Sequence, residues 1–309
     1  MHSITASFEP DASGPGPKQL GYLPMLKMND GHEIPMLAYG LGTARSKEEA
    51  EKTIELTAMA IKNGYYHLDC AESYKNETEL GVAIKKSGVD RSKLFVTTKL
   101  QRMDGDIPGA FAASLTRLGL SYMDMYLIHA PFSASSPEHL QRAWADMEAI
   151  QATGRARSIG VSNFRVADLE AILQTARTPP AINQVEFHPY LQHAEDGLLD
   201  FCRDKKIAIA AYGPLTAITK ARPGPCDDMY ETLAKKYGVT EGDIALRWCI
   251  DQAIVTVTTS ASEQRLQGYM HRLPSFKLTP KEIETIAAEG RKKHFRGFWA
   301  RKYAPEDKR

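Results

Sequence analysis

The chain has 309 residues, more than most single domains but within the length of one large α/β domain. With 43% hydrophobic and 25% charged residues, its composition is ordinary for a soluble globular protein. The net charge of +1 argues against a nucleic-acid binder, because there is no basic excess to drive counterion release. No apolar run approaches the ~20 residues that span a bilayer, which argues against a membrane protein.

The cysteines and the N-terminal residues indicate the cellular surroundings. Four cysteines are widely spaced with no CxxC pair, which suits a reduced intracellular protein better than a disulfide framework: Cys70, Cys202, Cys226 and Cys249. The opening "MHSITASFEPDASGPGPKQ" lacks the apolar segment of a secretory signal. Its Ser, Pro and Gly content predicts a disordered arm over residues 1–20, followed by one domain over residues 21–309. We expect a cytoplasmic monomer or weak dimer.

The organised part of the chain opens with the segment "LKMNDGHEIPML". Asp30 and Gly31 stand between two short apolar runs, and a two-residue turn with positive φ favours this pair. The segment therefore predicts an N-terminal β-hairpin.

After the hairpin, eight short apolar runs alternate with helical patterns. The runs are "MLAYG", "YYHLD", "LFVTTK", "MYLIHA", "RSIGVS", "INQVEF", "IAIAAYG" and "IVTVTT". The segment "SPEHLQRAWADMEAIQATG" shows the helical type: Ser136 can cap it, Pro137 suits its first turn and Gly154 suits its end. Its apolar residues recur on one face at helical spacing: Leu140, Trp144, Met147 and Ile150.

A βα unit repeated eight times predicts an α/β fold, a parallel (β/α)8 TIM barrel with an outer ring of helices. A doubly wound open sheet is the alternative, but it requires a G-x-G-x-x-G turn after the first strand, and "GLGTARS" does not supply one. After the eighth strand, "LTPKEIETIAAEG" predicts an extra C-terminal helix, followed by a tail. The basic stretch "RKKHFRGFWARKYAPEDKR" is interpreted as a solvated tail rather than a membrane or phosphate patch.

In such a barrel, functional groups gather at the carboxyl ends of the strands. Those ends carry Asp69, Tyr74, Lys99, His129, Ser162, Asn163, Asn183, Gln184, Glu186, Tyr212, Thr259 and Ser260. Six segments resemble, in order, the successive signatures of the aldo-keto reductases: "GYYHLDCAESYKNE", "TTKL", "LIHAP", "IGVSNF", "NQVEFHPY" and "AYGPL". The resemblance runs from about Leu26 to at least Leu278 and implies a carbonyl reductase built on this barrel.

The residue types agree with carbonyl reduction. A free tyrosine has a pKa near ~10, too high for an efficient acid at neutral pH, and a nearby ammonium lowers it. Lys99 can act in this way on Tyr74, and Asp69 can hold Lys99 charged and in place. His129 can hydrogen-bond and polarise the carbonyl oxygen. The resemblance assigns the same four catalytic roles.

Three nearby residues are expected to be structural. His67 lies two residues before Asp69, on the same face of its strand and deeper in the barrel, and is interpreted as a core residue. His188 is interpreted as a loop or packing histidine and Cys70 as a buried residue that points away from Asp69.

Carbonyl reduction requires a hydride donor. No amino-acid side chain can supply a hydride, so a nicotinamide cofactor is expected. Tyr212 offers a flat face for the ring, and Ser162, Asn163 and Gln184 offer hydrogen-bonding groups for its carboxamide. The resemblance places these residues there and adds further cofactor contacts at Gly42, Thr43, Gly213, Leu215, Thr259, Ser260 and Arg265. Gly213 stands where many relatives have Ser, so one pyrophosphate contact is lost.

The residues after the eighth strand bear on the choice between NADPH and NADH. Many relatives read P-K-S, with the Lys on the 2′-phosphate, whereas this chain reads Thr258, Thr259, Ser260. Arg265 remains to bind the phosphate and stack on adenine. The Thr-Thr-Ser version resembles a fungal branch that reduces α-keto amides and conjugated polyketones with NADPH, so NADPH is favoured and NADH stays open.

The substrate pocket differs from those relatives that carry tryptophans around the site. At these places the chain has Ala44, Gln101 and Ala130, which predict a wider and more polar pocket. Phe132, with Phe298 or Trp299 from the tail, is expected to form an apolar wall. Arg102 is either a partner for a carboxylate or second carbonyl, or an exposed loop arginine.

We therefore predict an NADPH-dependent reductase of activated carbonyls, namely α-keto amides, α-diketones, keto lactones and reactive aldehydes. One rival is a redox-sensing module of the same fold with slow turnover. Another is a metal-dependent barrel hydrolase with His67, Asp69, His129 and His188 as ligands, but Lys99 beside them would repel a cation, and we expect no metal site.

Overall fold

The computed structural model describes residues 23–42, 45–304 and 307–308. Eight parallel strands close into a barrel in the order β10-β3-β4-β5-β6-β7-β8-β9. The strands are β3 (Leu37–Gly40), β4 (His67–Asp69), β5 (Phe95–Leu100), β6 (Met123–Ile128), β7 (Ala156–Ser162), β8 (Ile182–Glu186), β9 (Ala208–Tyr212) and β10 (Val255–Thr258). The predicted TIM barrel is confirmed, and its strands coincide with the eight apolar runs. The predicted arm over residues 1–20 lies outside the described residues, and the domain bounds remain a prediction.

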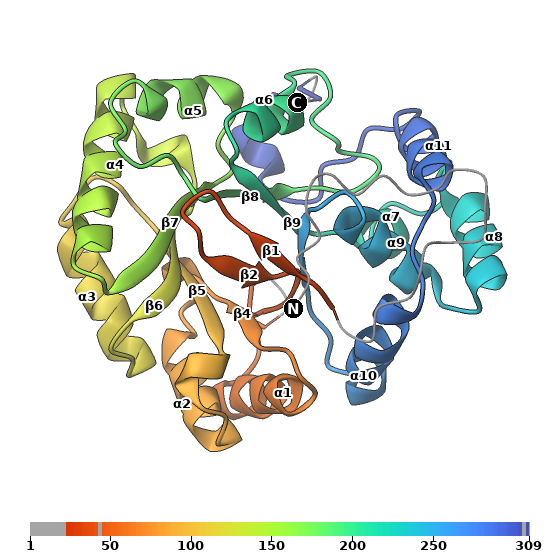
Figure 1. Cartoon of the computed structure of the whole chain (residues 1–309), viewed down its shortest axis with the longest axis horizontal. Helices are drawn as coiled ribbons and strands as arrows, with labels where there is room; N and C mark the ends of the chain where they lie inside the picture. The colour runs from red at the N-terminus through yellow and green to blue at the C-terminus, as the bar shows by residue number, and fades with distance from the viewer. Residues whose placement is uncertain (1–22, 43–44, 305–306, 309) are drawn as a thin grey trace.

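Helices surround the barrel on all sides (Figure 1). They are α1 (Ala50–Lys62), α2 (Glu77–Ser87), α3 (Ile107–Leu118), α4 (Pro137–Ala152), α5 (Val166–Leu173), α6 (Leu198–Asp204), α7 (Thr216–Thr219), α8 (Asp227–Tyr237), α9 (Glu241–Ile250), α10 (Glu263–Arg272) and α11 (Pro280–Gly290). The last of these is the predicted C-terminal extra helix. Helices α7 and α8, between β9 and α9, were not predicted.

Helix α4 shows how the sequence determines these boundaries. The hydroxyl of Ser136 accepts a hydrogen bond from the backbone N–H of His139, and Pro137 occupies the first turn. Beyond its end, Gly154 has a φ of 73°. The four apolar residues of its predicted face are buried against the barrel, as expected: Leu140, Trp144, Met147 and Ile150.

The predicted hairpin consists of β1 (Met25–Lys27) and β2 (Glu33–Pro35), paired antiparallel. Its turn has three residues rather than the two that the Asp-Gly pair suggested. The N–H of Gly31 donates to the carbonyl of Met28, and the N–H of Met28 donates to the carbonyl of His32. Only Gly31, at a φ of 87°, takes the left-handed conformation, which is the arrangement of a three-residue hairpin loop.

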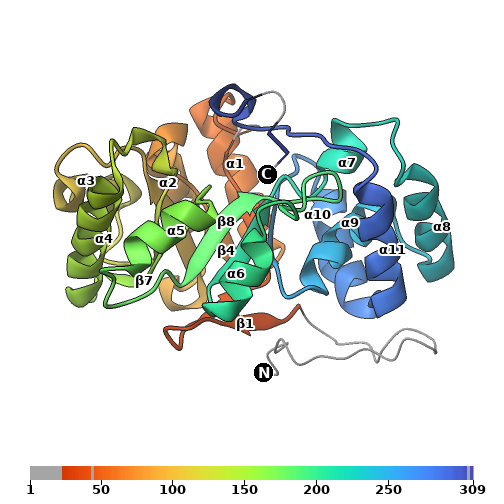
Figure 2. The ribbon, with the colours of Figure 1, turned by 90° about the horizontal axis from the view of Figure 1, so that it is seen from above.

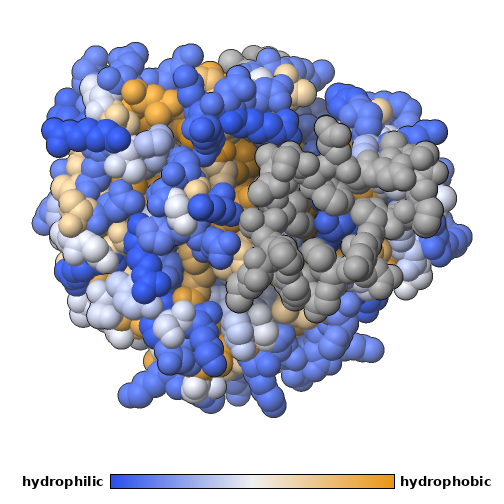
Figure 3. Space-filling model, viewed as in Figure 1, coloured by the Kyte–Doolittle hydropathy of each residue, from blue (hydrophilic) through white to orange (hydrophobic). Residues whose placement is uncertain are grey.

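The two ends of the barrel differ in what covers them. Figure 2 shows β1 at one end and the C-terminal segment across the opposite end. The face that carries the hairpin is mostly hydrophilic, with apolar groups scattered among charged ones (Figure 3). Among the described residues, no helix combines the length and apolarity needed to cross a membrane.

Candidate active site

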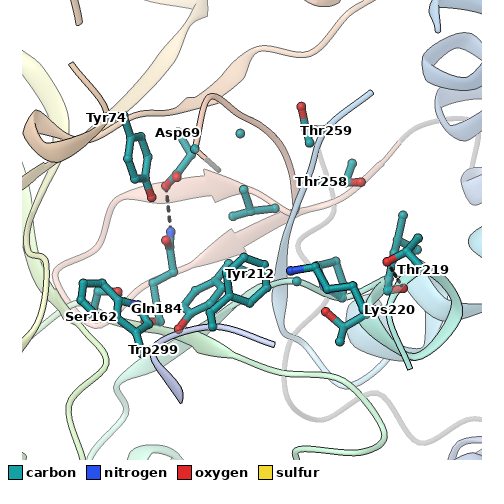
Figure 4. A pocket seen from close by; sticks show the side chains of 18 of the residues that line it. Asp69, Tyr74, Ser162, Gln184, Tyr212, Thr219, Lys220, Thr258, Thr259 and Trp299 are labelled. Carbon is teal, nitrogen blue, oxygen red and sulfur yellow. Dashed lines mark hydrogen bonds between the residues drawn. The ribbon is translucent and has the colours of Figure 1, made fainter. Parts of the chain in front are cut away.

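A cavity of about 530 Å³ opens at the carboxyl ends of the barrel strands, opposite the hairpin. Six strands each contribute a lining residue at or near their carboxyl ends: Gly40, Asp69, Ser162, Gln184, Tyr212 and Thr258. The loops that follow the strands and the C-terminal segment supply the remaining walls (Figure 4). The site therefore lies where the barrel topology predicts it.

Asp69 lines the cavity and forms an ion pair with Lys99, which is fully buried. Strands β4 and β5 pair Asp69 with Thr97, which brings Lys99, two residues further, to the same inner face. The Lys99 Nζ donates to Asp69 Oδ1 at 2.6 Å and to the carbonyl of Cys70 at 2.8 Å. The second carboxylate oxygen accepts from the Gln184 amide at 2.7 Å, so both charged groups are buried and well satisfied.

Tyr74 lies beside this ion pair, at the end of a 3-10 turn over Glu72–Tyr74 that follows β4. The Lys99 Nζ is 5.1 Å from the centre of its ring. Burial raises the pKa of Tyr74 and Lys99 lowers it, and burial has the larger effect. The expected net lowering of this pKa is therefore wrong for this structure, although the predicted effect of Lys99 is present. Burial lowers the pKa of Lys99, but Asp69 and Tyr74 outweigh it, so Lys99 remains charged.

His129 completes the group. Its ring meets that of Tyr74 edge to face, with 5.5 Å between the ring centres. Burial, and secondarily the charge of Lys99, lower the pKa of His129 to about 3, so the imidazole is neutral. The Ser73 hydroxyl lies 3.2 Å from its Nδ1. The four residues predicted to be catalytic thus lie together: Asp69, Tyr74 and His129 line the cavity, and Lys99 is buried against Asp69.

The residues predicted to hold a nicotinamide carboxamide form a hydrogen-bonded chain. The Tyr212 hydroxyl donates to Asn163 Oδ1 at 2.6 Å, and the Asn163 amide donates to the carbonyl of His129 at 2.9 Å. The Ser162 hydroxyl donates to the carbonyl of Gln184 at 2.7 Å. Tyr212, Ser162 and Gln184 line the cavity, whereas Asn163 lies behind them and fixes the orientation of the tyrosine. Figure 4 shows Tyr212 and Gln184 side by side below Tyr74.

Four of the other predicted cofactor contacts line the cavity: Gly42, Gly213, Leu215 and Thr259. Ser260 is buried and does not line it. Arg265 is exposed in the first turn of α10 and does not line the cavity. Thr43, like Ala44 of the predicted substrate pocket, lies outside the described residues.

Two residues predicted to form an apolar wall pack against each other beside the cavity. Trp299 lines the cavity, 5.7 Å from the ring of His129, and Phe132 packs against Trp299 with 5.3 Å between ring centres. Gln101 is exposed and Ala130 is half-buried, and neither lines the cavity. Arg102 is exposed and paired with Asp104, which agrees with the loop-arginine alternative.

Sequence reasoning missed several lining residues: Ser73, Pro214, Thr216, Thr219, Lys220 and Val257. Lys220 is the sole basic side chain among the residues that line the cavity within the described part of the chain. The segment "TAITK" that follows "AYGPL" contains the signal, because a cation close to the cofactor motif is a candidate phosphate ligand.

Three residues interpreted as structural are buried outside the cavity lining: His67, His188 and Cys70. His67 lies deeper in the barrel, with its ring nitrogens 3.1 Å from the Pro35 carbonyl and 3.1 Å from the Thr97 hydroxyl. His188 is hydrogen-bonded to Glu186. Across residues 23–42, 45–304 and 307–308, no group of three or more His, Cys, Asp or Glu side chains could hold a metal ion.

Comparison with known proteins identifies the family. Residues 37–289 match the model of the aldo/keto reductase family. An "NAD/NADP-dependent indole-3-acetaldehyde reductase" from Schizosaccharomyces pombe is 37% identical over 87% of this chain and 96% of its own length. An "NADPH-dependent alpha-keto amide reductase" from Saccharomyces cerevisiae is 34% identical over 89% of this chain and 94% of its own.

A solved structure agrees with these sequence matches. The Bombyx mori aldo-keto reductase in complex with NADP superposes with a TM-score of 0.77 and is 33% identical, covering 86% of this chain and 92% of its own. The predicted resemblance, including the fungal relatives, is thus confirmed. The chain belongs to the aldo/keto reductase family of oxidoreductases.

Proposed function

We propose that this protein is an NADPH-dependent reductase of activated carbonyl compounds, with Asp69, Tyr74, Lys99 and His129 as its catalytic residues. The observation that carries the proposal is that a phenol and a neutral imidazole line one cavity, with an ion-paired ammonium buried beside the phenol. This set can donate a proton to, and hydrogen-bond, one oxygen atom that gains negative charge.

The cavity has the features that a nicotinamide dinucleotide requires. A Cβ added to Gly42 would lie 3.0 Å from the Tyr74 ring, so glycine leaves the space beside the phenol open. Tyr212 supplies an aromatic ring whose orientation is fixed by Asn163. Lys220 supplies a cation, and the Thr259 side chain adds a polar group further along the same cavity. When bound, the dinucleotide supplies the hydride.

Tyr74 is the proposed proton donor to the carbonyl oxygen. Two of the three Lys99 protons are used by Asp69 and by the carbonyl of Cys70, which leaves the third for the Tyr74 hydroxyl. As Tyr74 releases its proton, the fixed ammonium stabilises the phenolate without any rearrangement. Because burial raises the pKa of Tyr74, the phenol stays protonated until a substrate oxygen accepts the proton.

His129 is proposed to orient the substrate. In the tautomer that carries its proton on Nε2, Nδ1 accepts from the Ser73 hydroxyl and Nε2 can donate to the carbonyl oxygen. A neutral imidazole acts here as a hydrogen-bond donor and does not compete with Tyr74 for the proton transfer. Trp299 lines the cavity beside His129, and Phe132 packs against it, which gives this side an apolar surface for the substrate.

Two observations support NADPH and activated carbonyls in particular. The Saccharomyces cerevisiae relative is an NADPH-dependent reductase of α-keto amides, and the Bombyx mori structure contains NADP. An adjacent electron-withdrawing carbonyl lowers the intrinsic barrier to hydride addition, so a loosely shaped pocket can still turn over such substrates.

The test is a substrate panel scored by the loss of NADPH absorbance. We expect α-diketones, α-keto lactones and α-keto amides to give higher kcat/KM than simple ketones or xylose. A higher kcat/KM for xylose than for any dicarbonyl would contradict the proposed substrate class. Repeating the panel with NADH measures the cofactor preference.

The redox-sensing module remains the alternative function, because it would use the same cavity. Steady-state turnover separates the two. A sensor would bind NADPH and oxidise it at a slow rate with every carbonyl tested, whereas a reductase turns over continuously with at least one.

A further inference from the structure

The C-terminal tail, defined here as residues 291–304, crosses the mouth of the barrel at the end opposite the hairpin (Figure 2). Phe298 and Trp299 of this tail line the cavity. The expected solvated tail is therefore wrong for this part of it, because residues 293–298 are half-buried. The contacts that hold the tail in place determine how the cavity is closed.

The main contact is a buried carboxylate that the proposed catalytic reaction does not use. Glu186, the last residue of β8, is only 2% exposed. Its Oε1 accepts from the N–H of Gly297 at 2.7 Å, and its Oε2 accepts from the N–H of Phe298 at 3.1 Å. A carboxylate can accept from two adjacent backbone N–H groups at once, and charge strengthens both bonds.

A histidine fixes the orientation of this carboxylate. The N–H of Tyr190 donates to His188 Nδ1 at 3.2 Å, so the ring proton lies on Nε2. Nε2 then donates to Glu186 Oε1 at 3.0 Å. Glu186 thus receives three hydrogen bonds, two of them from the tail, at a place where its charge has little access to water.

The tail residue next to the carboxylate covers the cofactor side of the cavity. The Phe298 ring meets Tyr212 edge to face at 5.3 Å, and the Lys220 Nζ lies 3.6 Å from the centre of its ring. A Cβ added to Gly213 would lie 2.9 Å from the Phe298 ring, and the φ of Gly213 is +66°. Glycine at this position, where many relatives carry serine, leaves the space that Phe298 occupies.

A second attachment lies beyond Trp299. The Tyr303 ring contacts two guanidinium groups, with Arg296 3.9 Å and Arg165 4.6 Å from its centre. Phe298 and Trp299 are therefore held from both sides. Only the first attachment, at Glu186, binds the backbone of Phe298 itself.

We propose that Glu186 is a positioning residue that closes the active site: it holds the tail so that Phe298 retains the cofactor and Trp299 forms the substrate wall. This inference rests on the proposed function for the identity of both ligands. Glu186 is not among the residues that line the cavity, whereas Tyr74 and His129 are, so it is not expected to touch the reacting atoms. Loosening the tail should therefore change binding more than chemistry.

The test variant is Glu186→Gln, which keeps the shape of the side chain. A glutamine oxygen in place of Oε1 keeps the bonds from His188 and Gly297, but the amide nitrogen then faces the N–H of Phe298, donor against donor. We expect tryptic cleavage after Arg296 and Arg301 to become roughly tenfold faster, as loss of a charge-assisted hydrogen bond implies. NADPH should dissociate several-fold faster, and the substrate KM should rise while kcat changes less than about twofold.

The matched control is Glu284→Gln. This glutamate is exposed on α11 and pairs with Arg291 at the start of the same tail, but it does not line the cavity. It should leave cleavage, NADPH dissociation and KM at the wild-type values. Unchanged cleavage and unchanged NADPH dissociation in Glu186→Gln would overturn the proposal.

A second variant keeps the test informative if Glu186→Gln does not fold. Phe298→Ala keeps the backbone bond to Glu186 and removes only the ring. It should speed NADPH dissociation without speeding tail cleavage, and a wild-type dissociation rate would contradict the assigned role of Phe298. Tail cleavage is measured without any ligand, so a protein that bound no NADPH would refute the proposed function and still allow the Glu186 contact to be tested.

Discussion

At Tyr74, two opposing effects act on one proton. Burial favours the neutral phenol, and the ammonium of Lys99 favours the phenolate. The neutral form prevails, which is the state that a proton donor needs before reaction. In the proposed reaction, the Lys99 ammonium stabilises the negative charge that develops on the Tyr74 oxygen during proton transfer. It therefore stabilises the transition state more than the enzyme before reaction.

The first prediction concerns the proton donor. Tyr74→Phe keeps the ring that packs against His129 but removes the hydroxyl. Carbonyl reduction should fall by ~10² or more, because general acid catalysis contributes at least that much. NADPH binding should change little, since Tyr212 and Lys220 are untouched. Steady-state kinetics and a fluorescence titration measure the two effects, and wild-type turnover would refute the proposed role of Tyr74.

The second prediction concerns the ion pair. Lys99→Met removes the charge beside Tyr74 and leaves Asp69 buried without its main partner. Turnover should fall nearly as far as in Tyr74→Phe, and folding stability should fall by about 3–5 kcal/mol as for other broken buried ion pairs. Asp69→Asn should have a milder effect of the same kind. Kinetics and thermal unfolding test both, and a fully active Lys99→Met would exclude any role for the ammonium.

The proposed catalytic group was predictable from sequence because each member lies at or near the carboxyl end of a strand or in the loop that follows it. Asp69 and Lys99 lie on neighbouring strands, so strand pairing alone brings them together. The Glu186 contact was not predictable, because it joins residues 186 and 298, 112 positions apart, through a tail with no periodic pattern. The net direction of the Tyr74 pKa was also missed, since it depends on how deeply the ring is buried.

At the scale of elements, the sequence indicated the strands more fully than the loops between them. The eight strands are short, apolar and nearly all buried on both faces, which gives a clear sequence signal. Helices α7 and α8 interrupt the βα alternation after β9. With four residues, α7 is too short for a hydrophobic repeat, whereas α8 carries one from which it could have been predicted, at Tyr230, Leu233, Ala234 and Tyr237. The hairpin turn was misjudged by one residue because an Asp-Gly pair is compatible with both a two-residue and a three-residue loop.

The third prediction belongs to the end of β10 and the start of α10, where relatives carry a phosphate-binding lysine. Thr259 lines the cavity and Arg265 is exposed in the next helix. Thr259→Lys should tighten NADPH binding several-fold, on the order of 1 kcal/mol, because solvent screens the added charge. NADH binding should hardly change. Arg265→Ala should weaken NADPH more than NADH if the guanidinium binds the 2′-phosphate.

Fluorescence titrations of the three proteins with both nucleotides, at low and high salt, measure these effects. Equal losses of NADH and NADPH binding in Arg265→Ala would show that this arginine does not bind the 2′-phosphate. Lys220 would then be the cation to test next, because it lines the same cavity.

At the scale of the whole molecule, two buried histidines make the free energy of unfolding depend on pH. Burial lowers the pKa of His67 to about 4 and that of His129 to about 3. The hydrogen bonds of His67 suit its neutral form, since one ring nitrogen faces a carbonyl acceptor and the other a hydroxyl. In the unfolded chain, both side chains bind a proton below pH ~6.5.

The last prediction is that acid destabilises the barrel through these two residues. Between pH ~6.5 and about 4, the unfolded state binds protons at His67 and His129 that the folded state does not, so the free energy of unfolding rises with pH in this window. For each histidine, the free energy of unfolding should be about 2 kcal/mol lower at pH 5 than at pH 7. Above pH ~6.5 both states are neutral at these sites, and this contribution is constant.

Urea unfolding of the wild type and His67→Asn across this pH range provides the measurement. The variant is expected to be less stable at every pH, because it loses ring contacts in the core. The slope of its unfolding free energy against pH should be smaller than in the wild type by the amount that corresponds to about one bound proton. His271→Gln is the control, since His271 is exposed on α10. A His67→Asn variant with the same pH slope as the wild type would show that His67 takes up its proton without unfolding, and the floor of the barrel would then have to accommodate a charged imidazole beside Pro35 and Thr97.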